Sequence, residues 1–198
     1  MRKVMLLMVV LALLASPLAS VAEELRIFTW SEYMDEEKMP ADFEAKYGIK
    51  VRLDIYENNE EMVAKLQAGG VSQYDIIVPS DYIMPVLINQ KLIQPLDLAK
   101  IPNLKNLKPL FRETSYDPGN KYSVAYQWGT VGLMYRRDKV SDEAVKSWSV
   151  LFDPAQQPGP FWLIDSVREM MGIALLYEGY DFNSTVPQEL KAAADLLV

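Results

Sequence analysis

The sequence has 198 residues, 50% hydrophobic and 24% charged, which is the composition of a folded globular chain and not of a disordered one. Its formal net charge of −7 argues against a nucleic-acid partner and is compatible with a cationic ligand. Histidine and cysteine are both absent, which excludes Ser-His-Asp and Cys-His nucleophiles, disulfide bonds and nearly all zinc sites. We therefore expect no catalytic residue of those types, no metal and no cofactor.

Residues 1–22 have the pattern of a secretory signal peptide. Arg2 and Lys3 come before an apolar run that ends at Leu14, and small residues close the segment at Ala22. The apolar run is much shorter than the roughly 20 residues that span a hydrocarbon core. The mature chain is therefore expected to begin directly after this segment and to be periplasmic. Because no cysteine is available for acylation, we expect it to be free and not lipid-anchored.

Short strands and helices alternate along the mature chain. The expected strands are residues 25–29, 51–55, 74–79, 130–135 and 161–164, and the expected helices are residues 37–47, 58–68, 142–152, 166–177 and 187–198. The continuous apolar run within residues 74–79 is typical of a strand covered on both faces. Strands that alternate with helices predict an α/β fold with a parallel sheet. A candidate crossover between domains lies near residues 127–130.

Three clusters of polar and aromatic residues follow expected strands at their carboxyl ends. They are Trp30, Ser31, Glu32 and Tyr33 in the first, Ser80, Asp81 and Tyr82 in the second, and Asp165 and Glu169 in the third. In an open α/β sheet the ligand crevice lies outside the carboxyl ends of the strands. The clusters are therefore candidate ligand-binding residues.

The residue types in these clusters suit a linear polycation. An aromatic face attracts an ammonium group by about 0.5–2 kcal/mol, and carboxylates hold it by charge-assisted hydrogen bonds. The same residues also have structural interpretations. Ser31, Ser80 and Asp81 could cap helices, Glu32 and Glu169 could favour helix dipoles, and Trp30, Tyr33 and Tyr82 could be core aromatics. Spacing alone leaves these alternatives open.

Five stretches of the chain, in order, resemble the spermidine/putrescine-binding proteins of bacterial polyamine ABC transporters. They are residues 29–33, 56–60, 74–82, 126–130 and 165–169. The resemblance extends from Leu25 to Val198. It implies a type II two-lobed periplasmic binding protein whose lobes close over the ligand by a hinge motion.

The resemblance also implies domain boundaries, roles and partners. Residues 23–128 would form the first α/β lobe, largely present, and residues 129–198 an incomplete second lobe. Trp30, Tyr33 and Tyr82 would line the cleft, Ser31, Glu32 and Ser80 would supply polar contacts, and Glu169 a carboxylate from the second lobe. Ser166 stands where spermidine-binding members carry an acid, which leaves one carboxylate fewer or shifts its role to Asp165. The expected partners are a polyamine and the ABC permease subunits of the inner membrane, with the chain itself a monomer.

Other interpretations remain open at this level. The same fold could bind a different small molecule, because fold does not dictate ligand. A secreted glycosidase could use Glu32 and Glu169 as acid and base, although nothing in the sequence marks either glutamate as activated. Members of this family continue well beyond 198 residues, so the chain is expected to be a truncated piece, and it could be an inactive fragment.

Overall fold

The computed structural model describes residues 23–198, so the expected signal peptide lies outside the described residues. The chain divides into two compact units. Of the described residues, the first contains 23–56 together with Lys65–Pro79. The second contains Glu57–Ala64 and Ser80–Val198. The lobe boundary between residues 128 and 129 stays a prediction.

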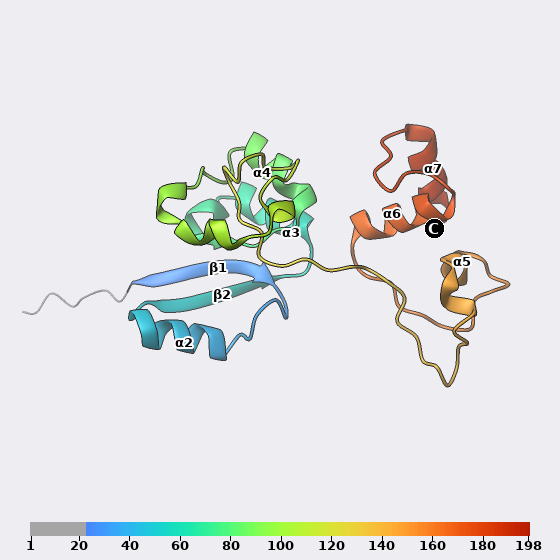
Figure 1. The fold of residues 1–198 in the computed structure, drawn as a ribbon. Coiled ribbons are helices and arrows are strands. Elements are labelled where there is room, and N and C mark those ends of the chain that lie inside the picture. The colour runs from blue at the N-terminus through green and yellow to red at the C-terminus, as the bar shows by residue number, and fades with distance from the viewer. Residues whose placement is uncertain (1–22) are drawn as a thin grey trace, which may run out of the picture. The chain divides into compact units, whose positions relative to one another are not determined.

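The first unit is built on a parallel three-stranded sheet with the order β2-β1-β3. Its strands are β1 (Glu24–Trp30), β2 (Lys50–Tyr56) and β3 (Ile76–Ile77), and Figure 1 shows β1 and β2 side by side. Phe28 and Tyr56 are almost completely buried and form the centre of this unit. The register places Trp30 opposite Tyr56 at the carboxyl ends of β1 and β2. The predicted parallel α/β arrangement is therefore confirmed for this unit.

Two helices follow the first two strands as the sequence predicts. Helix α2 (Lys38–Tyr47) carries Pro40 in its first turn, lies against β2 (Figure 1), and ends at Gly48 with a left-handed φ of 70°. Helix α3 (Asn59–Gln67) begins after Asn58, whose side-chain oxygen accepts a hydrogen bond of 2.8 Å from the Glu61 backbone N–H.

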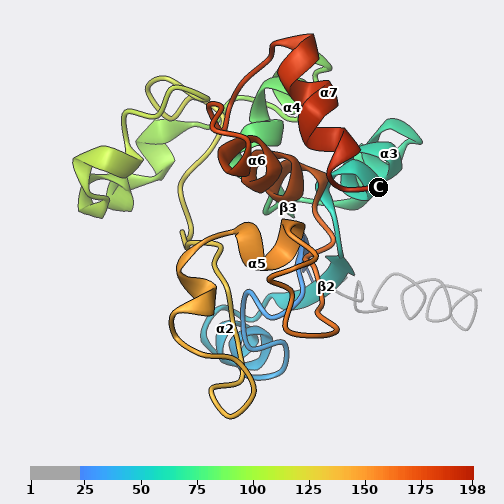
Figure 2. The same ribbon diagram turned by 90° about the vertical axis from the view of Figure 1, so that its right-hand side faces the viewer.

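The regular structure of the second unit is helical, and long irregular segments separate its α-helices and short 3-10 turns. Its α-helices, besides the start of α3, are α4 (Met84–Asn89), α5 (Ser149–Phe152), α6 (Val167–Tyr177) and α7 (Pro187–Asp195). The 3-10 turns of the chain are η1 (Gly70–Gln73), η2 (Asp81–Ile83), η3 (Leu98–Lys100), η4 (Pro102–Asn106), η5 (Pro109–Phe111) and η6 (Ala144–Lys146). In Figure 2, α6 and α7 lie against each other, and Ala174, Leu175 and Ala193 are buried where they pack. None of the helices described here is both long and apolar enough to cross a membrane.

Two expected strands are wrong. Residues 130–135 and 161–164 form no strand, although both segments are rich in β-forming side chains. A strand needs a neighbour with which to share its backbone hydrogen bonds, and neither segment has one within residues 23–198. Most of their apolar side chains are instead exposed, with Met134 and Trp162 each 99% accessible.

Two element boundaries and the burial of one strand also differ from expectation. The helix expected over 142–152 is divided into η6 and α5, because Ser147 is extended and its Oγ accepts a hydrogen bond from the Ser149 N–H at 3.1 Å. The final helix ends at Asp195, before the expected end at residue 198. Ile76 is 45% exposed, so β3 is not covered on both faces.

Candidate ligand-binding site

An aromatic cluster lies at the carboxyl end of β1 in the first unit. The Trp30 ring is 4.7 Å from the Tyr56 ring and 6.0 Å from the Tyr33 ring, measured between centroids. Tyr56 is fixed by its hydroxyl, which donates to the Val78 carbonyl oxygen at 2.6 Å. We call Trp30, Tyr33 and Tyr56 the Trp30 cluster.

The turn after β1 presents the remaining predicted residues of this strand end. Ser31 and Glu32 are both exposed, and Glu32 has a left-handed φ of 58°, which is uncommon for a residue with a side chain. The Trp30 ring is half-buried, and its Nε1–H is buried with no hydrogen-bond acceptor among the described residues. The structure therefore brings Trp30 and Tyr33 together and leaves the two polar side chains accessible to solvent.

A second cluster lies in the other unit, around Tyr82, one of the candidate residues that follow β3. The Tyr82 hydroxyl donates to Glu60 Oε1 at 3.4 Å, and the Ser80 backbone N–H donates to Asn59 Oδ1 at 3.2 Å. These bonds join the loop that follows β3 to the start of α3. Ser80 occupies the N-cap position of η2, but its side chain caps no backbone N–H.

The start of α6 completes this cluster. The Arg168 guanidinium carbon lies 5.9 Å from the centroid of the Tyr82 ring. Glu169, in the first turn of α6, accepts a hydrogen bond from Ser166 Oγ. We call Asn59, Glu60, Tyr82, Arg168 and Glu169 the Tyr82 cluster.

The electrostatics of the Tyr82 cluster are set by its carboxylates. Burial raises the pKa of the Tyr82 hydroxyl, and the negative charges of Glu60 and Glu169 raise that pKa further, while the Asn59 side chain acts in the opposite direction. A phenolate is therefore disfavoured here, and the negative potential that disfavours it attracts cations. Asp81 and Asp165 are exposed and lie outside this network.

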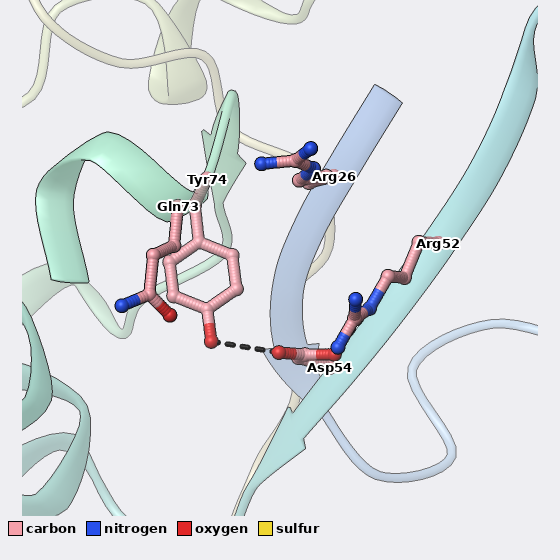
Figure 3. A pocket seen from close by; sticks show the side chains of 5 residues that line it. All are labelled: Arg26, Arg52, Asp54, Gln73 and Tyr74. Atoms are coloured by element: carbon pink, nitrogen blue, oxygen red, sulfur yellow. Dashed lines mark hydrogen bonds and ion pairs between the residues drawn. The ribbon is translucent and has the colours of Figure 1, made fainter. Parts of the chain in front are cut away.

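The first unit also contains a small pocket, shown in Figure 3. It is lined by Arg26, Arg52, Asp54, Gln73 and Tyr74. The Asp54 carboxylate in it already accepts a hydrogen bond of 2.8 Å from the Tyr74 hydroxyl and pairs with Arg52 and Lys65. Because its one carboxylate is neutralised by neighbouring cations, this pocket is a poor site for a cationic ligand.

Sequence reasoning missed several residues that the structure adds. Asn59 and Glu60 follow β2, so the rule that pointed to the other strand ends applies to them equally. Phe182, whose ring centroid lies 5.4 Å from the Arg168 guanidinium carbon, was missed because this contact forms only when α6 and the loop after it pack together. No group of three or more acidic side chains within residues 23–198 is arranged to hold a metal ion.

Three comparisons relate the chain to known proteins. Residues 38–198 match the family model of the bacterial extracellular solute-binding proteins. The chain is 39% identical over 186 residues to the putrescine-binding periplasmic protein SpuD of Pseudomonas aeruginosa, which corresponds to 88% of this chain and 50% of that protein. It is 36% identical over 169 residues to the spermidine/putrescine-binding periplasmic protein of Escherichia coli, covering 85% of this chain and 48% of that one.

A solved structure gives the same result. The putative spermidine/putrescine ABC transporter protein from Listeria monocytogenes matches with a TM-score of 0.78 at 37% identity, over 89% of this chain and 54% of that one. The chain thus spans about half the length of the relatives it matches. The fold class expected from the resemblance, the type II two-lobed α/β fold, is confirmed by this match. On this evidence the chain belongs to the family of bacterial extracellular solute-binding proteins.

Proposed function

We propose that this chain captures linear polyamines outside the cytoplasm, in the periplasm, and delivers them to the permease of an ABC importer, with no chemistry of its own. The relatives named above bind putrescine or spermidine according to their names, and the five stretches of resemblance include every candidate cluster.

One observation carries the proposal. The Tyr82 ring already receives a cation on its face, the guanidinium of Arg168 at 5.9 Å, while the Glu60 carboxylate accepts from the hydroxyl of the same ring. An aromatic face that attracts a cation beside carboxylates is the arrangement that an alkylammonium group requires. An anionic ligand would be repelled by the carboxylates of Glu60 and Glu169, so the cluster favours cations.

The candidate residues then take separate roles. Glu60 and Glu169 bind an ammonium group by charge-assisted hydrogen bonds, and Tyr82 offers its ring face. Trp30 and Tyr33, in the first unit, remain candidate apolar contacts, as the resemblance implies. Ser31, Glu32, Ser80, Asp81 and Asp165 remain candidate polar contacts.

Calorimetric titration of the purified chain with putrescine, spermidine, spermine and an uncharged sugar tests the proposal. Saturable binding of an amine and none of the sugar is expected. Glu169→Gln should weaken amine binding by about 30-fold, which corresponds to roughly 2 kcal/mol. Glu143→Gln is the matched control, because it removes the same charge from an exposed glutamate paired with Lys146. A folded chain that binds no amine would refute the proposal.

A further inference from the structure

Arg168 occupies a position that a bound amine would need. Its guanidinium carbon lies 5.9 Å from the centroid of the Tyr82 ring and 5.4 Å from that of the Phe182 ring. One of its terminal nitrogens donates to Asn183 Oδ1. The side chain is thus held between two aromatic rings within the second unit, and it is only partly exposed.

The arrangement depends on how Phe182 packs against α6. Gly172 follows Arg168 by four residues, so both lie on the same face of the helix. A Cβ atom at Gly172 would overlap the Phe182 ring, which means that the ring lies directly on the helix backbone at this point. Phe182 is therefore seated beside Arg168 by close packing, and its face is available to the guanidinium.

The charges around Tyr82 show what Arg168 does there. Glu60 accepts from the Tyr82 hydroxyl, and the negative charge of Glu169, the next residue after Arg168, reaches the same hydroxyl. Arg168 is the cation within this group. An ammonium group that binds the Tyr82 face occupied by Arg168 must displace the guanidinium from it. The net gain in binding free energy is therefore smaller than for an unoccupied ring face.

We propose that Arg168 is a specificity-determining residue of the Tyr82 cluster: it competes with the ligand for the aromatic face and lowers affinity most for the amines of highest charge. This inference rests on the proposed polyamine-binding function. A positive charge next to the site repels each ammonium group of the ligand, so a triamine loses more than a diamine. Arg168 thereby shifts selectivity toward diamines.

The test is titration of the wild-type chain and two Arg168 variants with putrescine and spermidine. Arg168→Gln should bind both amines more tightly, by roughly three- to ten-fold for the loss of a competing cation–π contact. The gain should be larger for spermidine, so that the ratio of the two dissociation constants changes by about two-fold or more. Arg168→Lys should give a smaller gain than Arg168→Gln, because the flexible lysine keeps the charge but leaves the ring face more readily.

Lys121→Gln provides the matched control. Lys121 lies over the Tyr122 ring at 5.5 Å, so this variant removes one positive charge and one cation–π contact away from the Tyr82 cluster. It should leave the selectivity ratio unchanged. Thermal unfolding of each variant reports whether Arg168 is needed for the fold, and Arg168→Lys keeps the comparison possible if the glutamine variant does not fold.

The outcomes separate the two proposals. Weaker amine binding by the folded Arg168→Gln variant would show that Arg168 supports the ligand, and it would overturn the inference alone. A gain equal to that of Lys121→Gln would overturn it as well, because net charge would then be the whole effect. If no folded variant, wild type included, bound any amine, the proposed function itself would fail.

Discussion

Tyr74→Phe removes a single hydroxyl from the first unit and leaves its packing unchanged. The Tyr74 hydroxyl donates to Asp54 Oδ2 at 2.8 Å, a bond visible in Figure 3, while its ring stacks on Phe28 with centroids 4.5 Å apart. Phenylalanine keeps the stacking and loses the hydroxyl, which interacts with both Asp54 and Lys65. Lys65 Nζ, 3.7 Å from Asp54 Oδ2, remains to balance the carboxylate.

The expected cost follows from the exposure of the bond. A hydrogen bond to a charged group contributes about 1.5–3 kcal/mol when it is buried. The Asp54 side chain is 26% exposed, which moves the expectation to about 1 kcal/mol. For a chain of this size that corresponds to a decrease in Tm of about 2–4 °C. Tyr135→Phe is the matched control, because Tyr135 donates at 2.7 Å to Asp142, whose side chain is 65% exposed, and it should cost less than about 0.5 kcal/mol.

The same bond makes a prediction about pH. The Tyr74 hydroxyl, followed by Arg52 and Lys65, holds the pKa of Asp54 below its ordinary value. A carboxylate with a depressed folded-state pKa stabilises the fold above its unfolded pKa, about 3.9, and this contribution disappears as the pH falls through the folded-state pKa. The difference between wild type and Tyr74→Phe in urea unfolding should therefore be complete at pH 7 and should shrink below about pH 4. A cost near zero at pH 7, or one that is unchanged at pH 3, would refute this reasoning.

Three further substitutions have outcomes that the structure sets. Asp117→Ala should destabilise the chain by about 3 kcal/mol in urea unfolding. The buried carboxylate accepts hydrogen bonds from the backbone N–H groups of Lys121, Tyr122 and Ser123 and from Ser123 Oγ, and the variant leaves these donors unpaired. An unchanged midpoint would contradict this role. Gly172→Ala should lower the Tm by several degrees and weaken amine binding, because the added Cβ would overlap the Phe182 ring. Calorimetry that found neither effect would count against the packing described for Phe182. The Cβ added by Gly48→Ala would contact no neighbouring atom, but the alanine must adopt a φ of 70°. The substitution should therefore lower the free energy of unfolding by about 1 kcal/mol, measured by thermal unfolding. A stabilised variant would argue against the left-handed conformation at the end of α2.

Local signals in the sequence were sufficient for four elements of the fold. β1, β2, α2 and α3 have the strand alternation, the proline in the first turn, the glycine stop and the Asn58 cap that predict them, and each depends on neighbours within a few residues. Trp30 lies at the carboxyl end of β1 and Tyr82 in the turn that follows β3, as the expected strands predict; their role in ligand binding stays a prediction. These features follow from backbone sterics and local hydrogen bonding, which a sequence encodes directly.

Tertiary structure decided what local patterns could not. Residues 130–135 and 161–164 read as strands, yet a strand exists only when another strand shares its hydrogen bonds, and neither has such a partner within residues 23–198. The pairing of Arg168 with Tyr82 joins residues 86 positions apart, and no spacing rule predicts it. The sequence by itself determined the residue types at each strand end and the elements that carry them. Only the packing of α6 against the loop that bears Phe182 decided that one of those aromatic faces already holds a cation, because long-range contacts depend on how separate elements fit together.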